Sequence, residues 1–252
     1  CTKICSYSFS DVKNLKNLTI PDSVTIIDDF AFYNNNDIEF ITPSNNLITI
    51  GKYSFYKCNR LRFVYFPDSI NSIGEYSFSK ASVVTIKIPD KASFIGEGAF
   101  CDTNLFTINF ASSSYTRINK LTFADMIYLE QVNITENIQF IDPKAFLKCQ
   151  QIKSYNIVGT NSNFKSIDGI LYSSDGTHLM KFPSFKKVDR SGPVIEDTVT
   201  TIDEYAFSYT SYLRTVELPS SIIEIKEGAF YFSYMDRFRG NLQSVGKYAF
   251  GY

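Results

Sequence analysis

The residues of this sequence that could do chemistry are few and isolated. The single histidine, His178, would have to act as the base beside a serine nucleophile or as one ligand of a metal. Neither a second histidine nor a Cys-x-x-Cys pair accompanies it in the sequence. We therefore interpret His178 as an ordinary surface histidine and expect no bound metal.

Glycine-rich and carboxylate-rich segments offer no better candidate. The sequence holds no G-x-S-x-G, P-loop or dinucleotide-binding motif. The two glycines of GEGAF, residues 96–100, belong to a repeated motif, and the neighbours Asp28 and Asp29 lie where the chain is expected to turn. The sequence predicts no enzyme, no catalytic residues and no cofactor.

The five cysteines are too few and too scattered for a disulfide framework. Cys58 and Cys149 each follow a repeated phenylalanine by three residues, and we interpret both as small buried turn residues. In coils stacked at about 5 Å they would lie roughly 20 Å apart, beyond the reach of a disulfide bond. We expect no disulfide among Cys58, Cys101 and Cys149.

Two N-glycosylation sequons are present, Asn17-Leu-Thr and Asn133-Ile-Thr. In a chain this rich in asparagine about two are expected by chance, so they carry almost no weight.

A repeated hexapeptide dominates the sequence. IGKYSF at residues 50–55 returns as IGEYSF at 73–78, as IGEGAF at 95–100 and as VGKYAF at 245–250. A fixed period of about 23 residues indicates a repeat architecture. The phenylalanines that close such blocks, predicted to form one buried internal column, are Phe9, Phe32, Phe55, Phe78, Phe100, Phe123, Phe146, Phe207, Phe230 and Phe250.

Each coil combines a strand with a corner. Leu18 and Ile20 alternate with polar residues, which predicts a strand with one buried face, and Pro21 ends it. A small residue always precedes the phenylalanine, which would let the short turn that carries the ring approach the sheet. Four residues before the phenylalanine, glycines such as Gly51 and Gly74 are expected to adopt left-handed dihedral angles.

The pattern L-x-x-V-x-I-P-x-S-V-x-x-I-G-x-Y-A-F resembles the 23-residue BspA-type leucine-rich repeat, found in surface proteins of bacteria and mucosal protists. The resemblance covers nearly the whole chain. It implies a β-dominated α/β repeat fold: a right-handed, curved leucine-rich-repeat solenoid with a parallel sheet on its concave side and short helical turns or extended segments behind. It also implies a surface protein involved in adhesion, although a fold alone does not fix a function.

The period predicts one solenoid domain over residues 1–252, and we expect a piece of a longer array. The period fails between Phe146 and Phe207. Ser166 and Ile167 match earlier coils and would place Tyr172 at the repeat phenylalanine position. The segment ILYSSDGTHLMKFP predicts a β-hairpin around Asp175 and Gly176.

This hairpin is interpreted as an insertion that completes an irregular coil at about residues 159–196; the alternative is a binding tab. The last coil, residues 231–250, is also degenerate. The positions that should be apolar there hold Asp236, Arg239 and Asn241. The segment YFSYMDRFRG is therefore expected to form no regular strand.

The strand register predicts an outward face of small polar residues, which is the usual recognition surface of a solenoid. Phe40, Phe63 and Tyr65 interrupt it with three aromatic rings on adjacent strands, and exposed aromatic clusters are common interface anchors. The alternative is that these rings only cover the first coils or meet a preceding part of the protein. The candidate ligand-binding residues are Phe40, Phe63, Tyr65, Thr42, Thr85, Lys87, Thr107 and Asn109.

Charge and hydropathy exclude two classes of partner. Lys plus Arg number 25 and Asp plus Glu 26, so no strong field recruits nucleic acid or an anionic membrane. No apolar run approaches the roughly 18 residues that a membrane span needs. The sequence favours a non-enzymatic module that binds a protein or glycan on its concave face, in adhesion or host interaction at a cell surface or outside the cell. An intracellular, cytoplasmic scaffold for protein interactions is the alternative.

Overall fold

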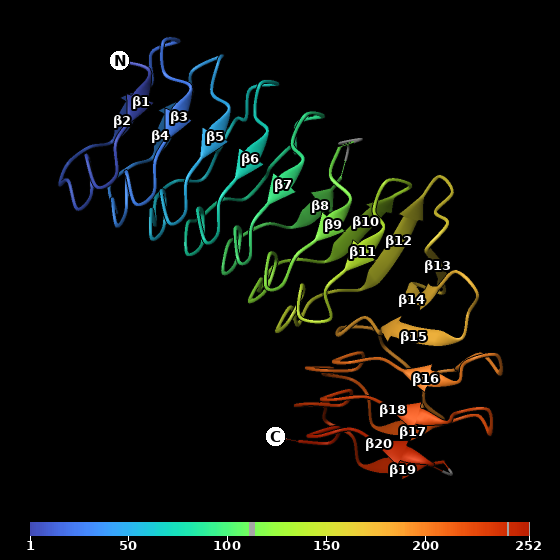
Figure 1. Cartoon of the computed structure of the whole chain (residues 1–252). Coiled ribbons are helices and arrows are strands. Elements are labelled where there is room, and N and C mark those ends of the chain that lie inside the picture. The colour runs from blue at the N-terminus through green and yellow to red at the C-terminus, as the bar shows by residue number, and fades with distance from the viewer. Residues whose placement is uncertain (111–113, 241, 252) are drawn as a thin grey trace. The chain divides into compact units, whose positions relative to one another are not determined.

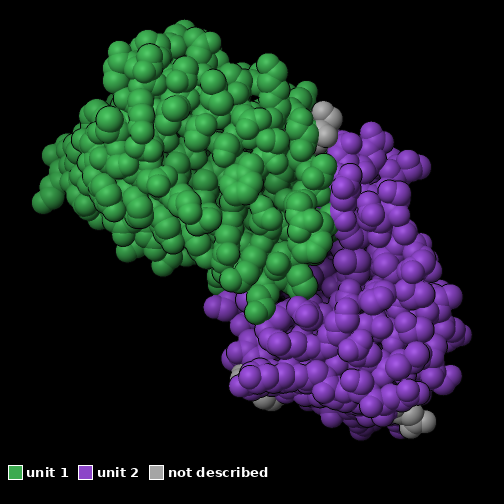
Figure 2. All heavy atoms as spheres, viewed as in Figure 1, with its two compact units in different colours: residues 1–128, 140–146 green, residues 129–139, 147–252 purple. Residues whose placement is uncertain are grey.

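The computed structural model describes the whole chain except residues 111–113, 241 and 252 (Figure 1). The chain divides into two compact units, coloured separately in Figure 2. Unit 1 comprises residues 1–128 and 140–146, and unit 2 comprises residues 129–139 and 147–252. That residues 1–252 form one continuous array stays a prediction.

Each regular coil of unit 1 contributes one short strand to each of two ladders. The first ladder contains β2 (Asn17–Thr19) and β4 (Phe40–Thr42), continued by isolated parallel bridges from Phe40 to Phe63 and from Phe63 to Thr85. Strand β8 (Thr107–Asn109) occupies the same repeat position in a later coil. The second ladder contains β1 (Lys3–Ile4), β3 (Ile26–Ile27), β5 (Thr49–Ile50), β6 (Ser72–Ile73) and β7 (Phe94–Ile95), followed by the pair β9 (Arg117–Ile118) and β11 (Phe140–Ile141).

The strands of unit 1 pair in parallel, mostly at a spacing of one 23-residue repeat. Asn17 pairs with Phe40 in the first ladder, and Ile27 pairs with Ile50 in the second. Strand β4 alternates as predicted, because Ile41 is buried while Phe40 and Thr42 on either side are exposed. This confirms stacked parallel coils.

Unit 2 repeats the two-ladder plan, and its strands between residues 131 and 181 are longer than those of unit 1. Its first-ladder strands are β10 (Gln131–Thr135), β12 (Ser154–Val158), β17 (Thr215–Glu217) and β19 (Arg237–Arg239). A second sheet runs in the order β13 (Phe164–Ile167), β14 (Ile170–Ser173), β15 (His178–Lys181), β16 (Thr201–Ile202), β18 (Glu224–Ile225) and β20 (Ser244–Val245).

A column of phenylalanine rings fills the centre of unit 1. Consecutive rings from Phe9 to Phe146 stack nearly parallel, with centroids 5.1 to 5.9 Å apart. The column is buried except at its first ring, since Phe9 is 40% exposed. The prediction that all ten rings are buried is therefore wrong at Phe9, and also at Phe250, which is 39% exposed. A terminal ring has a stacked neighbour on one side only.

The column of unit 2 includes a ring that the sequence did not reveal. Phe182 stacks on Phe207 with centroids 4.8 Å apart, and Phe207 stacks on Phe230 at 4.7 Å. The prediction that Tyr172 occupies this position is wrong, because Tyr172 lies buried within β14. Phe182 follows Leu179 of β15 by three residues, whereas Phe207 follows Ile202 of β16 by five.

The predicted short helical turns are absent, because the described residues contain no helix. Tyr53 and Lys57, two residues before and after Phe55, have φ of 54° and 60°, in the left-handed region that a right-handed helix excludes. The amides of Tyr53, Phe55 and Lys57 donate to carbonyl oxygens of the next coil. These three alternate backbone donors of the turn therefore join coils together instead of closing a helix.

The expected left-handed angles at Gly51, Gly74, Gly96 and Gly246 are also wrong, since none of these residues has a positive φ. A Cβ at Gly51 would lie 2.5 Å from the backbone of Asp28 and Asp29 in the preceding coil. Glycine is required at this position because the backbones of two coils approach closely there. The left-handed angle falls two residues later, at Tyr53.

The predicted hairpin insertion is not supported. Strands β13, β14 and β15 do pair antiparallel. However, β15 pairs in parallel with β16, in the register of Leu179 with Ile202. Strand β15, which follows the turn, therefore takes the position of this coil's regular strand in the sheet. Strands β14 and β13 add two antiparallel strands beyond it.

The last coil also contradicts its prediction. Strand β19 pairs regularly with β17, and Val216 lies opposite Phe238. Phe238 packs edge-on against Phe230 and Phe250, so it is the inward residue, while Arg237 and Arg239 are exposed. The spacing from Val216 to Phe238 is 22 residues, so a count of 23 placed the inward position one residue late.

Candidate protein-binding surface

The three rings singled out by the sequence project from the first ladder of unit 1. We call Phe40, Phe63 and Tyr65 the aromatic patch. Their exposed fractions are 50%, 54% and 67%. Ile41, which follows Phe40, and Phe66, which follows Tyr65, are buried. Side chains alternate along an extended chain, so the rings of the patch point away from the core.

Backbone pairing brings the patch together. Phe40 and Phe63 are partners in a parallel bridge, and Phe63 bridges in turn to Thr85. Adjacent strands lie about 4.8 Å apart, so Phe40 and Phe63 are direct neighbours. Tyr65 lies two residues beyond Phe63. Among the ring contacts of the described residues, none joins two members of the patch.

The other candidate residues surround the patch unevenly. Thr42, Thr85 and Lys87 are exposed, whereas Thr107 in β8 is half-buried. The backbone of Asn109 closes β8, but its side chain lies outside the described part of the structure. The structure therefore places four of the polar candidates on or near the surface, and a ligand-binding role stays a prediction for all five.

A groove of about 480 Å³ adjoins the patch. Phe63 forms one part of its lining, and two arginines, Arg60 and Arg62, form another. The remaining lining residues are Glu39, Asn59 and Ser82. Volumes of roughly 300 to 1,000 Å³ are typical of ligand pockets, so the groove has room for side chains of a partner.

Hydrogen bonds between coils hold the groove in shape. The Ser82 hydroxyl donates to the Asn59 carbonyl oxygen at 2.6 Å, and the Asn59 amide donates to Asn36 Oδ1 at 2.7 Å. The Arg60 guanidinium lies 3.3 Å from Asp37 and 4.0 Å from Glu39. The walls are thus formed before any ligand arrives.

A small apolar cavity of about 20 Å³ lies beneath the patch. Tyr65, Val64 and Pro43 line it together with core residues such as Phe55 and Phe66. Its size is that of about one water molecule, but its lining offers no polar partners that a water needs.

One further exposed aromatic pair was missed from the sequence. The ring centroids of Phe106 and Tyr128 lie 5.4 Å apart with the rings tilted by 32°, and both residues are exposed. Phe106 occupies the repeat position just before the outward row, the position held by Arg62 in an earlier coil. Extending the register by one residue would have revealed it.

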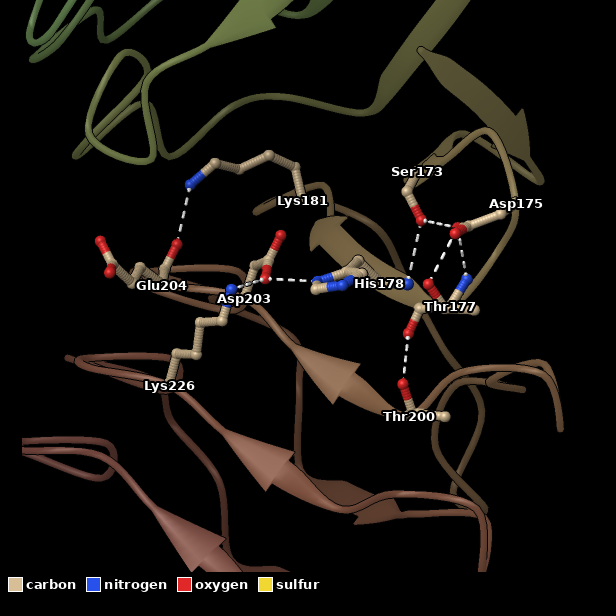
Figure 3. A network of polar contacts seen from close by, with 9 residues as sticks. All are labelled: Ser173, Asp175, Thr177, His178, Lys181, Thr200, Asp203, Glu204 and Lys226. Atoms are coloured by element: carbon tan, nitrogen blue, oxygen red, sulfur yellow. Dashed lines mark hydrogen bonds and ion pairs between the residues drawn. The ribbon is translucent and has the colours of Figure 1, made fainter. Parts of the chain in front are cut away.

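His178 is engaged in an ion-pair network in unit 2 (Figure 3). Its Nδ1 lies 2.9 Å from Asp203 Oδ1, and Lys226 Nζ lies 2.7 Å from the same oxygen. The three residues come from successive strands or their ends, so the network ties coils together. Lys181 nearby is buried, and its ammonium donates to the Tyr205 carbonyl oxygen at 3.2 Å.

This network shows no arrangement for catalysis or metal binding. Ser173 Oγ accepts a hydrogen bond from the backbone amide of His178 and donates to Asp175. Within the described residues, no group of three or more His, Cys, Asp or Glu side chains could hold a metal ion. His178 is half-exposed and acts as a structural partner of Asp203.

The predicted burial of two cysteines is confirmed, since Cys58 and Cys149 are both buried. Burial raises the pKa of the Cys58 thiol to about 12. Burial, followed by the charge of Asp125, raises the pKa of Cys101 to about 12. Both thiols are therefore protonated and poorly nucleophilic at neutral pH.

Comparison with known proteins decides the family. Residues 1–89, 49–175 and 180–252 match the BspA type Leucine rich repeat region, in six copies. The chain belongs to the BspA-type leucine-rich repeat family. No curated protein matches the chain. Membership of this repeat family is consistent with a protein-binding repeat module.

Solved structures of bacterial leucine-rich repeat proteins share the fold. A leucine rich cell surface protein of Faecalibacterium prausnitzii has a TM-score of 0.79 and 25% identity, over 94% of this chain and 64% of that one. A leucine-rich repeat protein of Eubacterium ventriosum has a TM-score of 0.75 and 21% identity, over 84% and 56%.

The pneumococcal vaccine antigen PcpA has a TM-score of 0.72 and 19% identity, over 98% of this chain and 64% of that one. The BspA-type chain thus matches less than two thirds of the length of each of these three structures. Among its own described residues, no helix is long and apolar enough to cross a membrane.

Proposed function

We propose that this BspA-type chain is a non-enzymatic protein-binding module that acts in adhesion at a cell surface, and that its partner docks on the aromatic patch. The observation that carries the proposal is the exposure of Phe40, Phe63 and Tyr65 on the first ladder. Large exposed rings at the centre of a surface are frequent binding hot spots.

The rigidity of the supporting coils adds to this argument. Ile41 and Phe66, which flank the patch, are packed in the core, and the bridges from Phe40 to Phe63 and from Phe63 to Thr85 fix the spacing of the coils. A partner that meets preformed rings loses less conformational entropy on binding. The exposed Thr42 and Thr85 offer polar contacts at the rim.

The surface role is supported by the relatives. One structural neighbour is described as a cell surface protein and another as a vaccine antigen. Labelling of intact cells that express the whole protein, with an antibody raised against this chain, tests the role. Labelling only after permeabilisation would contradict it.

The partner is to be sought by screening the purified chain against arrayed extracellular matrix proteins and glycans. The triple variant Phe40→Ser, Phe63→Ser, Tyr65→Ser serves as the comparison. We expect at least one protein to bind the native chain and to lose binding to the variant. A glycan held by the same three rings would contradict the assignment of a protein partner, and ligands indifferent to the variant would place the binding site elsewhere.

A further inference from the structure

We propose that the groove beside the aromatic patch binds a carboxylate side chain, so that the partner presents an acidic, extended peptide segment with an apolar residue next to the acid. This inference rests on the proposed function, since it names the chemistry of the partner at the same site. Two observations support it: the charges that line the groove, and the position of Arg62 beside Phe63.

The two arginines of the groove differ in their partners. Arg60 is held by Asp37 at 3.3 Å and approaches Glu39 at 4.0 Å. Arg62 is exposed and forms no ion pair with any described residue of the chain. One guanidinium in the groove is therefore available for a ligand. Arginine binds a carboxylate through two parallel hydrogen bonds, which makes such pairs both strong and specific.

Arg62 and Phe63 line the same groove although they are consecutive residues. Both are exposed, so one ligand segment can meet the guanidinium and the ring together. An acidic residue beside an apolar one matches this pair. Tyrosine, arginine and other large side chains of this kind dominate the energetics of protein interfaces.

The charge around the patch favours an acidic partner. Lys87 is exposed and occupies, in the next coil, the repeat position of Tyr65. Of the acids near the groove, Asp37 and Glu39 face Arg60. Arg62 and Lys87 beside the patch form no ion pair with any described residue, and both are positive. Electrostatic complementarity at these two side chains therefore favours negative segments over basic ones.

An extended peptide fits the spacing of the patch. Alternate side chains of a strand lie about 6.8 Å apart on one face. Phe63 and Tyr65, two residues apart with half-buried Val64 between them, present the same period. A peptide running beside this segment can therefore place successive outward side chains on the groove and on the patch.

The test uses a phage library of random linear 12-residue peptides, selected on the immobilised chain and depleted on the triple serine variant of the patch. The retained peptides are expected to be enriched in Asp or Glu beside an aromatic or aliphatic residue. Synthetic copies should bind Arg62→Gln at least tenfold more weakly than the native chain. Lys16→Gln removes a charge from the same repeat position two coils away, and it should change the affinity less than twofold.

A double-mutant cycle closes the test. Replacing the peptide's acid with its amide should cost no further affinity once Arg62 is glutamine, because the pair is already broken. Patch-dependent peptides that lack acids, or that bind Arg62→Gln as well as Lys16→Gln, would overturn this inference and leave the proposed function standing. A library without patch-dependent peptides would also overturn it, and the proposed function is then decided by the screen of folded proteins. Thermal melts must show that each variant is folded.

Discussion

The ring of Phe182 stacks on the ring of Phe207 with centroids 4.8 Å apart, and the amide of Phe182 donates to the Ala206 carbonyl oxygen at 2.8 Å. Phe207 makes the same pair of contacts one coil later, with Phe230 and Ala229. Phe182 therefore takes the place of a repeat phenylalanine in the column, although the 61-residue gap between Phe146 and Phe207 hides it in the sequence.

Phe182 should accordingly contribute to stability like a regular member of the column. We expect Phe182→Ala to lower the free energy of unfolding by about 3 to 5 kcal/mol, since it removes a buried ring and leaves a cavity. Urea unfolding measures the change. Tyr212→Ala is the control, because this ring is 41% exposed and should cost far less. Equal losses for both variants would contradict the role of Phe182.

The column of unit 1 should be most sensitive at its centre. Phe78→Ala and Phe123→Ala are each expected to cost about 3 to 5 kcal/mol of unfolding free energy, because both rings are buried between two stacked neighbours. Phe9 has one such neighbour and is partly exposed, so Phe9→Ala should cost less. A larger loss at Phe9 than at Phe78 would argue against the column as the source of stability.

Two buried serines, each directly before a phenylalanine of the column, are expected to reduce the stability of the native chain. Ser54 Oγ and Ser77 Oγ are buried and have no hydrogen-bond partner. Ser54→Ala and Ser77→Ala should each raise the free energy of unfolding by about 1 kcal/mol, since an unsatisfied buried hydroxyl is costly. Alanine already occupies this position at Ala31 and Ala99.

Thr122 supplies the matched control for these serines. It stands at the same repeat position, but its hydroxyl donates to the Asn119 carbonyl oxygen at 2.8 Å. Thr122→Ala should therefore destabilise the chain. If the serine variants melt at a lower temperature than the native chain, the hydroxyls of Ser54 and Ser77 are hydrogen-bonded in solution and the explanation fails.

Alkaline pH should destabilise the fold through its buried thiols. Burial raises the pKa of Cys58 from 9.0 to about 12, so between these values the unfolded chain releases a proton that the folded chain retains. The stability from this group is complete below pH 9 and falls as the pH rises toward 12. Urea unfolding at pH 8 and pH 11 should show a smaller decrease for Cys58→Ala than for the native chain. The exposed Cys5 is the control, and an equal benefit from Cys5→Ala would contradict the assignment.

The sequence predicted the fold where the period holds and failed where local geometry changes it. Alternation at Phe40 to Thr42 and the spacing of the phenylalanines are direct consequences of burial, and both were visible. The left-handed angle at Tyr53 was not visible, because tyrosine normally disfavours it. In the structure it accompanies a hydrogen bond from the Tyr53 amide to the Glu75 carbonyl oxygen of the next coil.

Register errors explain the remaining differences. Phe238 lies 22 residues after its partner Val216, and Phe182 lies only three residues after Leu179. A one- or two-residue deletion leaves no mark in composition, yet it moves every inward residue. The groove beside Phe63 could not be predicted from the sequence either. The sequence does not show that Asp37 of the neighbouring coil reaches Arg60, while Arg62 has no such acid.

The most direct test of the account measures the dissociation constant of the identified partner for the native chain and for the triple serine variant of Phe40, Phe63 and Tyr65. A second triple variant, Phe94→Ser, Tyr234→Ser, Tyr248→Ser, removes three comparably exposed rings outside the patch. We predict that the patch variant binds at least about 30-fold more weakly, equivalent to roughly 2 kcal/mol, while it melts like the native chain and the second variant binds as tightly as the native chain. A folded patch variant with native affinity would contradict the account.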